Sequence, residues 1–357
     1  MKFDFAIGNP PYQESRETTK DMPVYNDFMD AAYEIADKVE LITPGRFLFN
    51  AGATSKKWNQ KMLNDTHFKV LEYTANSDEI FSNTDIKGGV AIHYYDHLKN
   101  FEPVDVFSSY QELNSIRRKV CAYNEYTCIN SIMYPYSTYT LSDGLWNDFP
   151  KLREEVEYIS KNRDKLKKED KEGKLSNLRI ITTNIFDLLN DLFFDTPQEN
   201  DNYCCIVGRK NNSRCYKWIK ASYIDTGENY PKWKVIVTAV NGAGKFGEVL
   251  SEPFIEEPFV GYTQTFLGIG SCDEKNEAEA ILKYIKSKFA RTLLGILKIT
   301  QHNPPEKWKY VPLQDFTSSS DIDWSKSIPE IDQQLYRKYG LTEEEIEFIE
   351  THVKPME

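Results

Sequence analysis

The chain has 357 residues, of which 40% are hydrophobic and 28% are charged, and its formal net charge is −11 at pH 7. This length allows two domains of ordinary size, no apolar stretch reaches the roughly 18 residues of a membrane span, and no signal peptide pattern opens the chain, so we expect a cytoplasmic protein without a membrane partner. The negative charge argues against a protein that coats nucleic acid over its whole surface, although it permits a local basic groove.

The first predicted element is a strand that ends at a stiff turn. Residues 3–8 (FDFAIG) alternate in the manner of a short buried strand. Pro10 and Pro11 stop this strand, because proline cannot donate to a sheet ladder and fixes its own φ angle. Asn9 and Tyr12 are therefore held just beyond the carboxyl end of a strand, which is where open α/β sheets bind ligands.

Strands and helices alternate over the next eighty residues. Apolar spacing predicts helices over 25–36 and 58–63, and strands over 39–43, 68–73 and 88–95. This order is typical of a parallel, wound sheet, so we expect an α/β fold class for the N-terminal part.

The remainder of the chain has a different pattern. A connecting helix is predicted over 111–120 and a strong helix over 275–298, and the tail from residue 321 is helical, with Thr342 and Glu345 spaced as a capping box. We therefore expect three parts, over 1–110, 111–320 and 321–357, of which the tail serves packing rather than chemistry.

Residues 203–247 are basic within an acidic protein. They hold eight basic and two acidic residues, a net charge of +6, with tyrosines and tryptophans between them. Cations for phosphates and aromatic rings for stacking are what a nucleic-acid surface needs, and the alternative is a twisted β region whose lysines are merely solvated. The candidate DNA contacts are Arg209, Lys210, Arg214, Lys217, Trp218, Lys232 and Lys234.

The six cysteines contain no C-x-x-C pair and no histidine cluster lies near them. We therefore expect them to act as small buried apolar residues, and we expect no metal site.

The Asn-Pro-Pro-Tyr turn is suited to holding a planar amine. The side-chain oxygen of Asn9 and the carbonyl oxygen of Pro10 are both acceptors, and two acceptors that grip the two N–H bonds of an aromatic amine favour a more nucleophilic nitrogen. Tyr12 offers a face on which an unstacked base could rest, and Pro11 stiffens the turn.

These residues carry a resemblance to a known family. FDFAIGNPPY resembles the (Asp/Asn/Ser)-Pro-Pro-(Tyr/Phe) motif of S-adenosylmethionine-dependent amino-methyltransferases. The segments VELITPGRFLFNAG and IFSNTDIKGGVAIHYYD resemble later motifs of the gamma-class adenine DNA methyltransferases of restriction–modification systems, the group typified by the TaqI methylase. More loosely, residues 281–316 resemble the helix and closing segment of the target-recognition region in such enzymes.

The resemblance implies a fold, a reaction and a site. The fold would be the C-terminal half of a Rossmann-like methyltransferase sheet, followed by a mixed α+β target-recognition domain. The reaction would transfer a methyl group from S-adenosylmethionine directly to an adenine flipped out of double-stranded DNA. The motif Asn9, Pro10, Pro11 and Tyr12 would hold the adenine, and Thr43, Pro44 and Phe47 would line the same pocket.

The sequence departs from this family at the methyl-donor site. Members bind the donor through a Phe-x-Gly-x-Gly loop upstream of the motif, and only eight residues precede Asn9 here. The donor site would then lie on another polypeptide that supplies the N-terminal half, or have been lost, or be formed in a circularly permuted chain by FLGIGSC (266–272). We expect NGAGKFG (241–247) to be a hairpin turn and HNPPE (302–306), the second Asn-Pro-Pro copy, to be only a turn.

Two further readings stay open. Methyltransferases of protein glutamine and of some RNAs share Asn-Pro-Pro-Tyr, and a non-catalytic DNA-specificity component could retain an inactive pocket. The long basic and aromatic region after the catalytic part favours DNA as the substrate, with a restriction endonuclease as a possible further partner.

Overall fold

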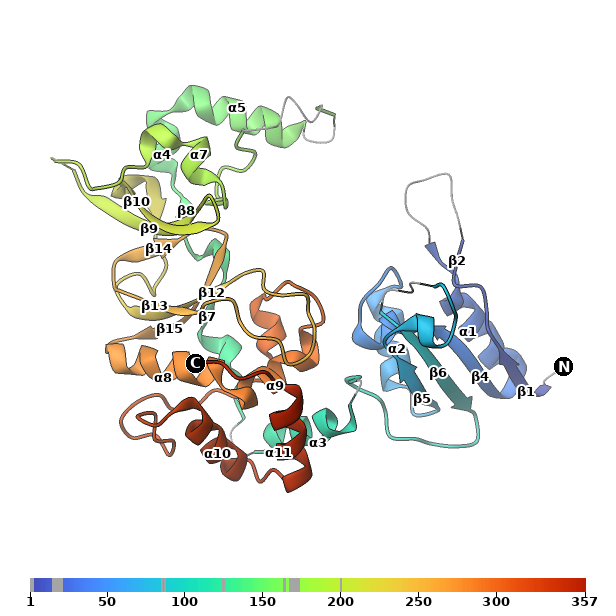
Figure 1. Ribbon diagram of the computed structural model, residues 1–357. Coiled ribbons are helices and arrows are strands. Elements are labelled where there is room, and N and C mark those ends of the chain that lie inside the picture. Colours follow the sequence, from blue (N-terminus) through green and yellow to red (C-terminus); the bar gives the residue numbers. More distant parts are fainter. Residues whose placement is uncertain are drawn as a thin grey trace. The chain divides into compact units, whose positions relative to one another are not determined.

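A computed structural model of the chain divides into two compact units, Met1–Ser115 and Ile116–Glu357 (Figure 1). The structure describes residues 3–14, 22–84, 86, 88–108, 110–123, 126–162, 165–166, 174–199 and 201–357. The functional roles assigned to the three predicted parts of the chain stay a prediction. Among the described residues, no helix is both long and apolar enough to cross a membrane.

The first unit is built on one four-stranded sheet. Its spatial order is β1–β4–β6–β5, formed by β1 (Phe3–Gly8), β4 (Ala36–Pro44), β6 (Val90–Asp96) and β5 (Phe68–Thr74). Strands β1 and β4 are parallel, and β6 is antiparallel to both of its neighbours. The α/β class and the predicted strands are confirmed, but the prediction of a wholly parallel sheet is wrong for β6. Among its described residues, the connection from β5 to β6 contains only the short η2 (Ser77–Glu79), whereas a parallel return needs a longer crossover, usually a helix.

Two helices connect the strands of this sheet. Helix α1 (Tyr25–Ile35) joins β1 to β4, and α2 (Lys56–Asn64) joins β4 to β5. Ser55 begins α2, because its hydroxyl accepts a hydrogen bond from the Trp58 amide at 3.2 Å. The core of the unit lies between sheet and helices, and it includes Met29, Val39 and Phe68. A small ladder of β2 (Gln13–Glu14) and β3 (Met22–Pro23) follows the Asn-Pro-Pro-Tyr turn.

Strand β1 is not buried as its sequence predicted. The exposed fractions are 53% for Phe3, 60% for Phe5 and 77% for Ile7. β1 is the edge strand of the sheet, and its register places Ala6 beside Val39 of the core but Ile7 beside Glu40. Alternation therefore sends one set of side chains to the core and the aromatic set to the opposite face, which sequence periodicity alone does not distinguish.

The described residues of the second unit form three separate sheets. One has the order β13–β12–β15–β7, the second has the order β10–β9–β14, and the third pairs β11 with β8. The strands are β7 (Met133–Tyr134), β8 (Thr140–Leu141), β9 (Tyr203–Lys210), β10 (Ser213–Lys220), β11 (Ile224–Asp225), β12 (Trp233–Thr238), β13 (Phe254–Glu256), β14 (Val260–Tyr262) and β15 (Phe266–Cys272). A cluster of buried residues that includes Tyr139, Ile206 and Tyr262 forms the core around the second sheet.

Helices flank these sheets. The described helices are α3 (Gln111–Cys121), α4 (Asp143–Asp148), α5 (Pro150–Lys161), α7 (Ile185–Leu188), α8 (Lys275–Lys286), α9 (Lys288–Leu297), α10 (Ile328–Lys338) and α11 (Glu343–His352). The single helix predicted over 275–298 is two helices, because Ser287 ends α8 and caps α9 through a hydrogen bond from the Ala290 amide at 3.1 Å. Asp332 of α10 also accepts hydrogen bonds from the first amides of α9.

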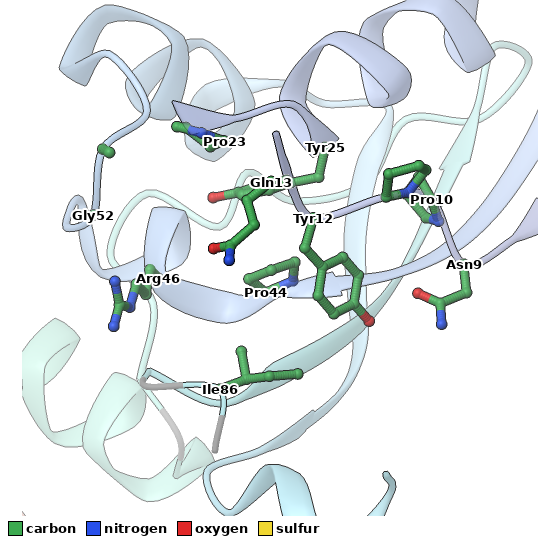
Figure 2. Close-up of a pocket in the computed structure, with 12 residues that line it drawn as sticks. Asn9, Pro10, Tyr12, Gln13, Pro23, Tyr25, Pro44, Arg46, Gly52 and Ile86 are labelled. Carbon is green, nitrogen blue, oxygen red and sulfur yellow. The ribbon is translucent and has the colours of Figure 1, made fainter. Parts of the chain in front are cut away.

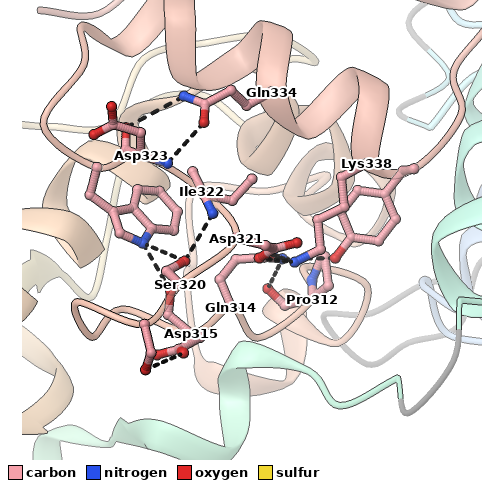
Figure 3. A network of polar contacts seen from close by, with 12 residues as sticks. Pro312, Gln314, Asp315, Ser320, Asp321, Ile322, Asp323, Gln334 and Lys338 are labelled. Atoms are coloured by element: carbon pink, nitrogen blue, oxygen red, sulfur yellow. Dashed lines mark hydrogen bonds and ion pairs between the residues drawn. The ribbon is translucent and has the colours of Figure 1, made fainter.

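Helix α10 is tied to the preceding loop by a polar network (Figure 3). Lys338 of α10 donates to Gln314 at 2.9 Å and to Asp321 at 2.8 Å. The indole N–H of Trp324 donates to the carbonyl of Asp315 at 2.9 Å. The capping box of Thr342 and Glu345 is present in α11, which confirms that prediction. The packing role of the tail stays a prediction.

Candidate functional site

A cavity of about 720 Å³ opens beside the Asn-Pro-Pro-Tyr turn in the first unit (Figure 2). It lies at the carboxyl ends of β1 and β4, which the sequence analysis named as the place for a ligand. Its lining residues are Asn9, Pro10, Pro11, Tyr12, Gln13, Pro23, Tyr25, Pro44, Arg46, Gly52, Ala53 and Ile86.

All four motif residues border this cavity. Asn9 is exposed and Pro10 is half-buried, so the acceptor oxygens of the turn remain open to a ligand. The backbone carbonyl of Tyr12 accepts a hydrogen bond from the Val24 amide at 3.2 Å, which fixes the end of the turn. The Tyr12 hydroxyl is buried and finds no partner among the described residues, and burial raises its pKa. The Tyr12 hydroxyl therefore stays protonated, and the uncharged ring presents a largely apolar surface.

Of the three further residues predicted for the pocket, one lines the cavity and two lie in the core. Pro44 borders the cavity, whereas Thr43 and Phe47 are fully buried in the core. The hydroxyl of Thr43 lies 3.1 Å from Nε2 of His93, and burial lowers the pKa of His93 to about 3. The Phe47 ring packs edge-on against Trp58. These two residues thus support the sheet and helix behind the cavity.

Arg46 is a lining residue that the sequence analysis did not identify. Its stem lies against Gly52 and Gly88, whose φ angles are +91° and +89°. A Cβ atom at Gly52 would lie 3.2 Å from the Arg46 Cβ, so the glycines leave room for this arginine. Its charge also acts on Tyr25, whose pKa is raised by burial and partly lowered by Thr54 and Arg46. The signal in the sequence was the set of glycines around the predicted Thr43–Phe47 loop.

The lysines of the basic stretch are mostly paired in the structure. Four of these lysines each form an ion pair with a carboxylate that lies outside residues 203–247. The pairs are Lys210 with Asp187 at 3.1 Å, Lys217 with Asp195 at 2.5 Å, Lys220 with Asp201 at 2.8 Å, and Lys232 with Asp273. The net charge of the sequence window therefore overstates the positive charge of this surface.

Lys234, one of the predicted DNA contacts, does not lie on the surface. It is fully buried, and its ammonium group donates to the carbonyl of Glu257 at 3.1 Å. Burial lowers the pKa of Lys234 to about 8, against the attraction of Glu256, which faces it across the β12–β13 ladder. Its burial follows from its place in β12, an interior strand whose residues 234–238 are all buried, and a count of basic residues does not register this.

Arg209, Arg214 and Trp218 complete the predicted set. Arg214 stacks on Phe254, with 3.9 Å between the guanidinium carbon and the ring centroid. Trp218 is half-buried and its backbone pairs with Phe194. Arg209 is half-buried near the end of β9, and its Nε is buried without a partner among the described residues.

Neither glycine-rich stretch has the form of a donor-binding loop. FLGIGSC forms the buried strand β15, where a side chain at Gly268 would meet Asn229 and Tyr262. NGAGKFG lies in the connection between the antiparallel strands β12 and β13, and its Ala243 and Gly244 amides donate to Glu248 at 2.9 and 3.1 Å. The described residues therefore do not fit S-adenosylmethionine at either place, contrary to the permuted reading.

Comparison with known proteins gives matches to part of the chain. Residues 1–81 match the family model described as Eco57I restriction-modification methylase. A curated protein of Mycoplasma pneumoniae (strain ATCC 29342 / M129 / Subtype 1), described as an uncharacterized adenine-specific methylase, is 28% identical over 107 residues, which are 29% of this chain and 25% of that protein. A solved structure of the type IIG restriction endonuclease BpuSI is 10% identical with a TM-score of 0.31, over 87% of this chain and 44% of that one.

The chain thus spans about a quarter of the curated relative's length. The family match falls on the part of the chain that carries the cavity. The curated relative matches less than a third of the chain. Together these two matches support a restriction–modification methylase.

Proposed function

We propose that this chain supplies the catalytic pocket of a gamma-class, TaqI-like DNA methyltransferase that methylates N6 of adenine within a restriction–modification system. The observation that carries this proposal is the cavity at the carboxyl ends of β1 and β4, into which Asn9, Pro10 and Tyr12 are gathered. The match of residues 1–81 to the Eco57I restriction-modification methylase family supports the reaction class, and the adenine-specific relative supports the choice of base.

The residues of the pocket act on the adenine amine. An adenine extruded from the duplex rests against Tyr12, which offsets about 1–3 kcal/mol of the stacking lost. The side-chain oxygen of Asn9 and the carbonyl oxygen of Pro10 each accept a hydrogen bond from one of the two N–H groups of the adenine N6 amine. As positive charge develops on N6, these fixed acceptors stabilise it more strongly than they stabilise the neutral amine, which is what lowers a barrier. S-adenosylmethionine, as the methyl donor of the reaction, supplies the electrophilic carbon: the bond from N6 to the methyl carbon forms as the bond from sulfur to that carbon breaks. S-adenosylhomocysteine is the leaving group, and N6 then releases one proton to solvent.

The donor is held, in this proposal, by a separate part of the enzyme that joins the free edge of β1. Both crossover helices follow the direction β1 to β4 to β5, and right-handed crossovers in one direction cover one face of a sheet. Parallel strands joined by crossover helices are normally covered on both faces, yet Phe5 and Ile7 of β1, which pairs in parallel with β4, are exposed on the opposite face. Strands wound away from β1 in the other direction would cover them and would place the cavity at a topological switch point.

The methylome of the cell that encodes this chain tests the proposed function. Single-molecule sequencing of genomic DNA is compared between cells with the gene and cells from which it is deleted. We expect N6-methyladenine at one sequence motif to disappear on deletion. An unchanged DNA methylome, or a loss confined to methylated protein or RNA, would overturn the proposal.

Equilibrium dialysis of the purified chain with labelled S-adenosylmethionine tests the separate donor part. We expect no donor binding by the chain alone. Donor bound with normal affinity would show that the 357 residues hold a complete donor site, and the proposed role of the β1 edge would fail.

A further inference from the structure

The cavity beside the Asn-Pro-Pro-Tyr turn has room for more than a base. Its volume of about 720 Å³ lies within the range of about 300–1,000 Å³ that encloses a drug-sized ligand, and a purine ring is smaller than such a ligand. The proposed function uses the part of the lining that Asn9, Pro10 and Tyr12 form. The rest of the lining is therefore available to the remainder of the molecule that carries the adenine.

Arg46 borders the cavity away from Asn9. Figure 2 shows these two residues on opposite sides of Tyr12 and Pro44. They also come from different strands, since Asn9 follows β1 and Arg46 follows β4, in the short helix η1 (Gly45–Phe49). The cavity thus has an amine side at Asn9 and an arginine side at Arg46.

The surrounding backbone holds Arg46 in place. A Cβ atom at Gly88 would collide with Cγ of Arg46, and one at Gly52 would lie 3.4 Å from its Cδ, so the stem of the arginine runs between two glycines. The carbonyl oxygen of Arg46 also accepts a hydrogen bond from the Ala51 amide at 3.1 Å. The residue is nevertheless exposed, so its guanidinium group is fixed at its base and accessible to a ligand.

The arginine side favours an anion. Arg46 is the one charged residue among the described residues that line the cavity, and no aspartate or glutamate lies among them. A guanidinium offers five N–H donors in a planar fork, which matches the oxygen atoms of a phosphate. A nucleotide combines a phosphate with an aromatic amine, whereas the neutral glutamine side chain of a protein substrate carries no charge to pair with Arg46.

We propose that Arg46 binds the backbone phosphate next to the target adenine, so that the cavity takes a nucleotide rather than an isolated amine. This inference rests on the proposed function and narrows its substrate class to nucleic acid. The adenine rests on Tyr12 with its amine at Asn9, and the sugar–phosphate backbone passes Arg46. The phosphate contact positions the extruded nucleotide, while the two acceptors of the turn act on its amine.

Titration of the full chain with small nucleotides tests this assignment. Ligand-observed NMR gives the Kd of deoxyadenosine, of its 5′-monophosphate and of its 3′-monophosphate. The titrations contain no S-adenosylmethionine, whose carboxylate is another anion that an arginine could bind. The variants are Arg46→Gln, which removes the charge, and Arg46→Lys, which keeps it.

The matched control is Lys99→Gln, which removes an exposed cation from the same unit. Lys99 follows Asp96, which pairs with Lys38 near the start of β4, whereas the cavity lies beyond the end of β4 at Pro44. The control therefore changes the net charge of the chain by the same amount at the opposite end of the sheet.

We expect at least one of the two monophosphates to bind the wild-type chain about tenfold more tightly than deoxyadenosine does, as a hydrogen bond to a charged group typically allows. Arg46→Gln should abolish this advantage, and Arg46→Lys should retain part of it, because lysine keeps the charge but not the planar fork. Lys99→Gln should retain all of it. The affinity for deoxyadenosine should be the same in all four proteins, which would show that the cavity is intact in each.

Two results would overturn the inference. One is a wild-type chain that binds neither monophosphate more tightly than deoxyadenosine, and the other is a phosphate advantage that persists in Arg46→Gln. A titration with thymidine 5′-monophosphate separates this inference from the proposed function. Equal affinity for the adenine and thymine nucleotides would contradict the adenine pocket and leave the phosphate contact of Arg46 intact.

Discussion

The two units show their functional residues in very different ways. In the first unit, four consecutive residues from Asn9 to Tyr12 all border one cavity. In the second unit, the residues of a basic stretch are dispersed: Lys234 is buried, Arg214 stacks on Phe254, and several lysines pair with distant carboxylates. A stiff local motif is positioned by its own backbone, whereas the role of a charge depends on partners that the fold brings from elsewhere.

The largest effect that separates the units is expected from Asn9→Ala. Removing one of two acceptors from the adenine amine should reduce methylation by about 10²–10³-fold, while DNA binding by the second unit stays nearly unchanged. The measurement is the rate of N6-methyladenine formation in cells that carry the variant, with Asn64→Ala, an exposed asparagine at the end of α2, as the matched control. Wild-type methylation by Asn9→Ala would remove Asn9 from the mechanism.

The next effect concerns the buried cation of the second unit. Glu256→Ala leaves the Lys234 ammonium buried without its carboxylate, and we expect a loss of about 3 kcal/mol in the free energy of unfolding. Lys234→Met, which removes the charge and keeps the length, should be neutral or stabilising. The free energy of unfolding of each variant is measured by urea titration, with hydrogen exchange of the β12 and β13 amides as the readout. Equal destabilisation by the two variants would show that the lysine, not an unpaired charge, supports the sheet.

A pH-dependent change in stability is expected in the first unit. Burial lowers the pKa of His93 from 6.5 to about 3, so the unfolded chain binds more protons than the folded chain between these values. Stability is therefore complete above pH 6.5 and falls by up to about 1.4 kcal/mol per pH unit as the pH drops toward 3. Hydrogen exchange of β4 and β6, corrected for the intrinsic rate, should show this slope. It should vanish in His93→Gln and persist in His67→Gln.

The smallest expected effect is a change in the salt dependence of DNA binding when a cation of the basic stretch is removed. Removing a cation that contacts a phosphate lowers the slope of log K against log salt by about 0.9. We expect this change for Arg209→Gln, Lys210→Gln and Arg214→Gln, and no change for the buried Lys234→Met. Titration of duplex DNA over a range of salt concentrations provides the slopes. A lower slope for Lys234→Met would mean that this side chain leaves the core when DNA binds.

The sequence was sufficient for elements that depend on local periodicity. Helices α1 and α2 and strands β4 and β5 lie where apolar spacing placed them, and so does the capping box of α11. It was insufficient where a neighbour decides the outcome: nothing covers the aromatic face of the edge strand β1 among the described residues, and no crossover helix lies among the described residues before the antiparallel β6. The same limit applies to the site, since Arg46 reaches the cavity only through the close approach of two glycines.

The pairing of β7 with β15 has a consequence for synthesis. Tyr134 pairs with Gly268, so the ribosome must add ~130 residues before this ladder can close, which takes roughly 7–26 s at 5–20 residues per second. The sheet of the first unit is complete once Asp96 has emerged. The nascent chain therefore passes through a stage in which the unit that carries the pocket can already be folded. At this stage the hydrophobic segments of the second unit are synthesised but still unpaired, and chaperones would protect them.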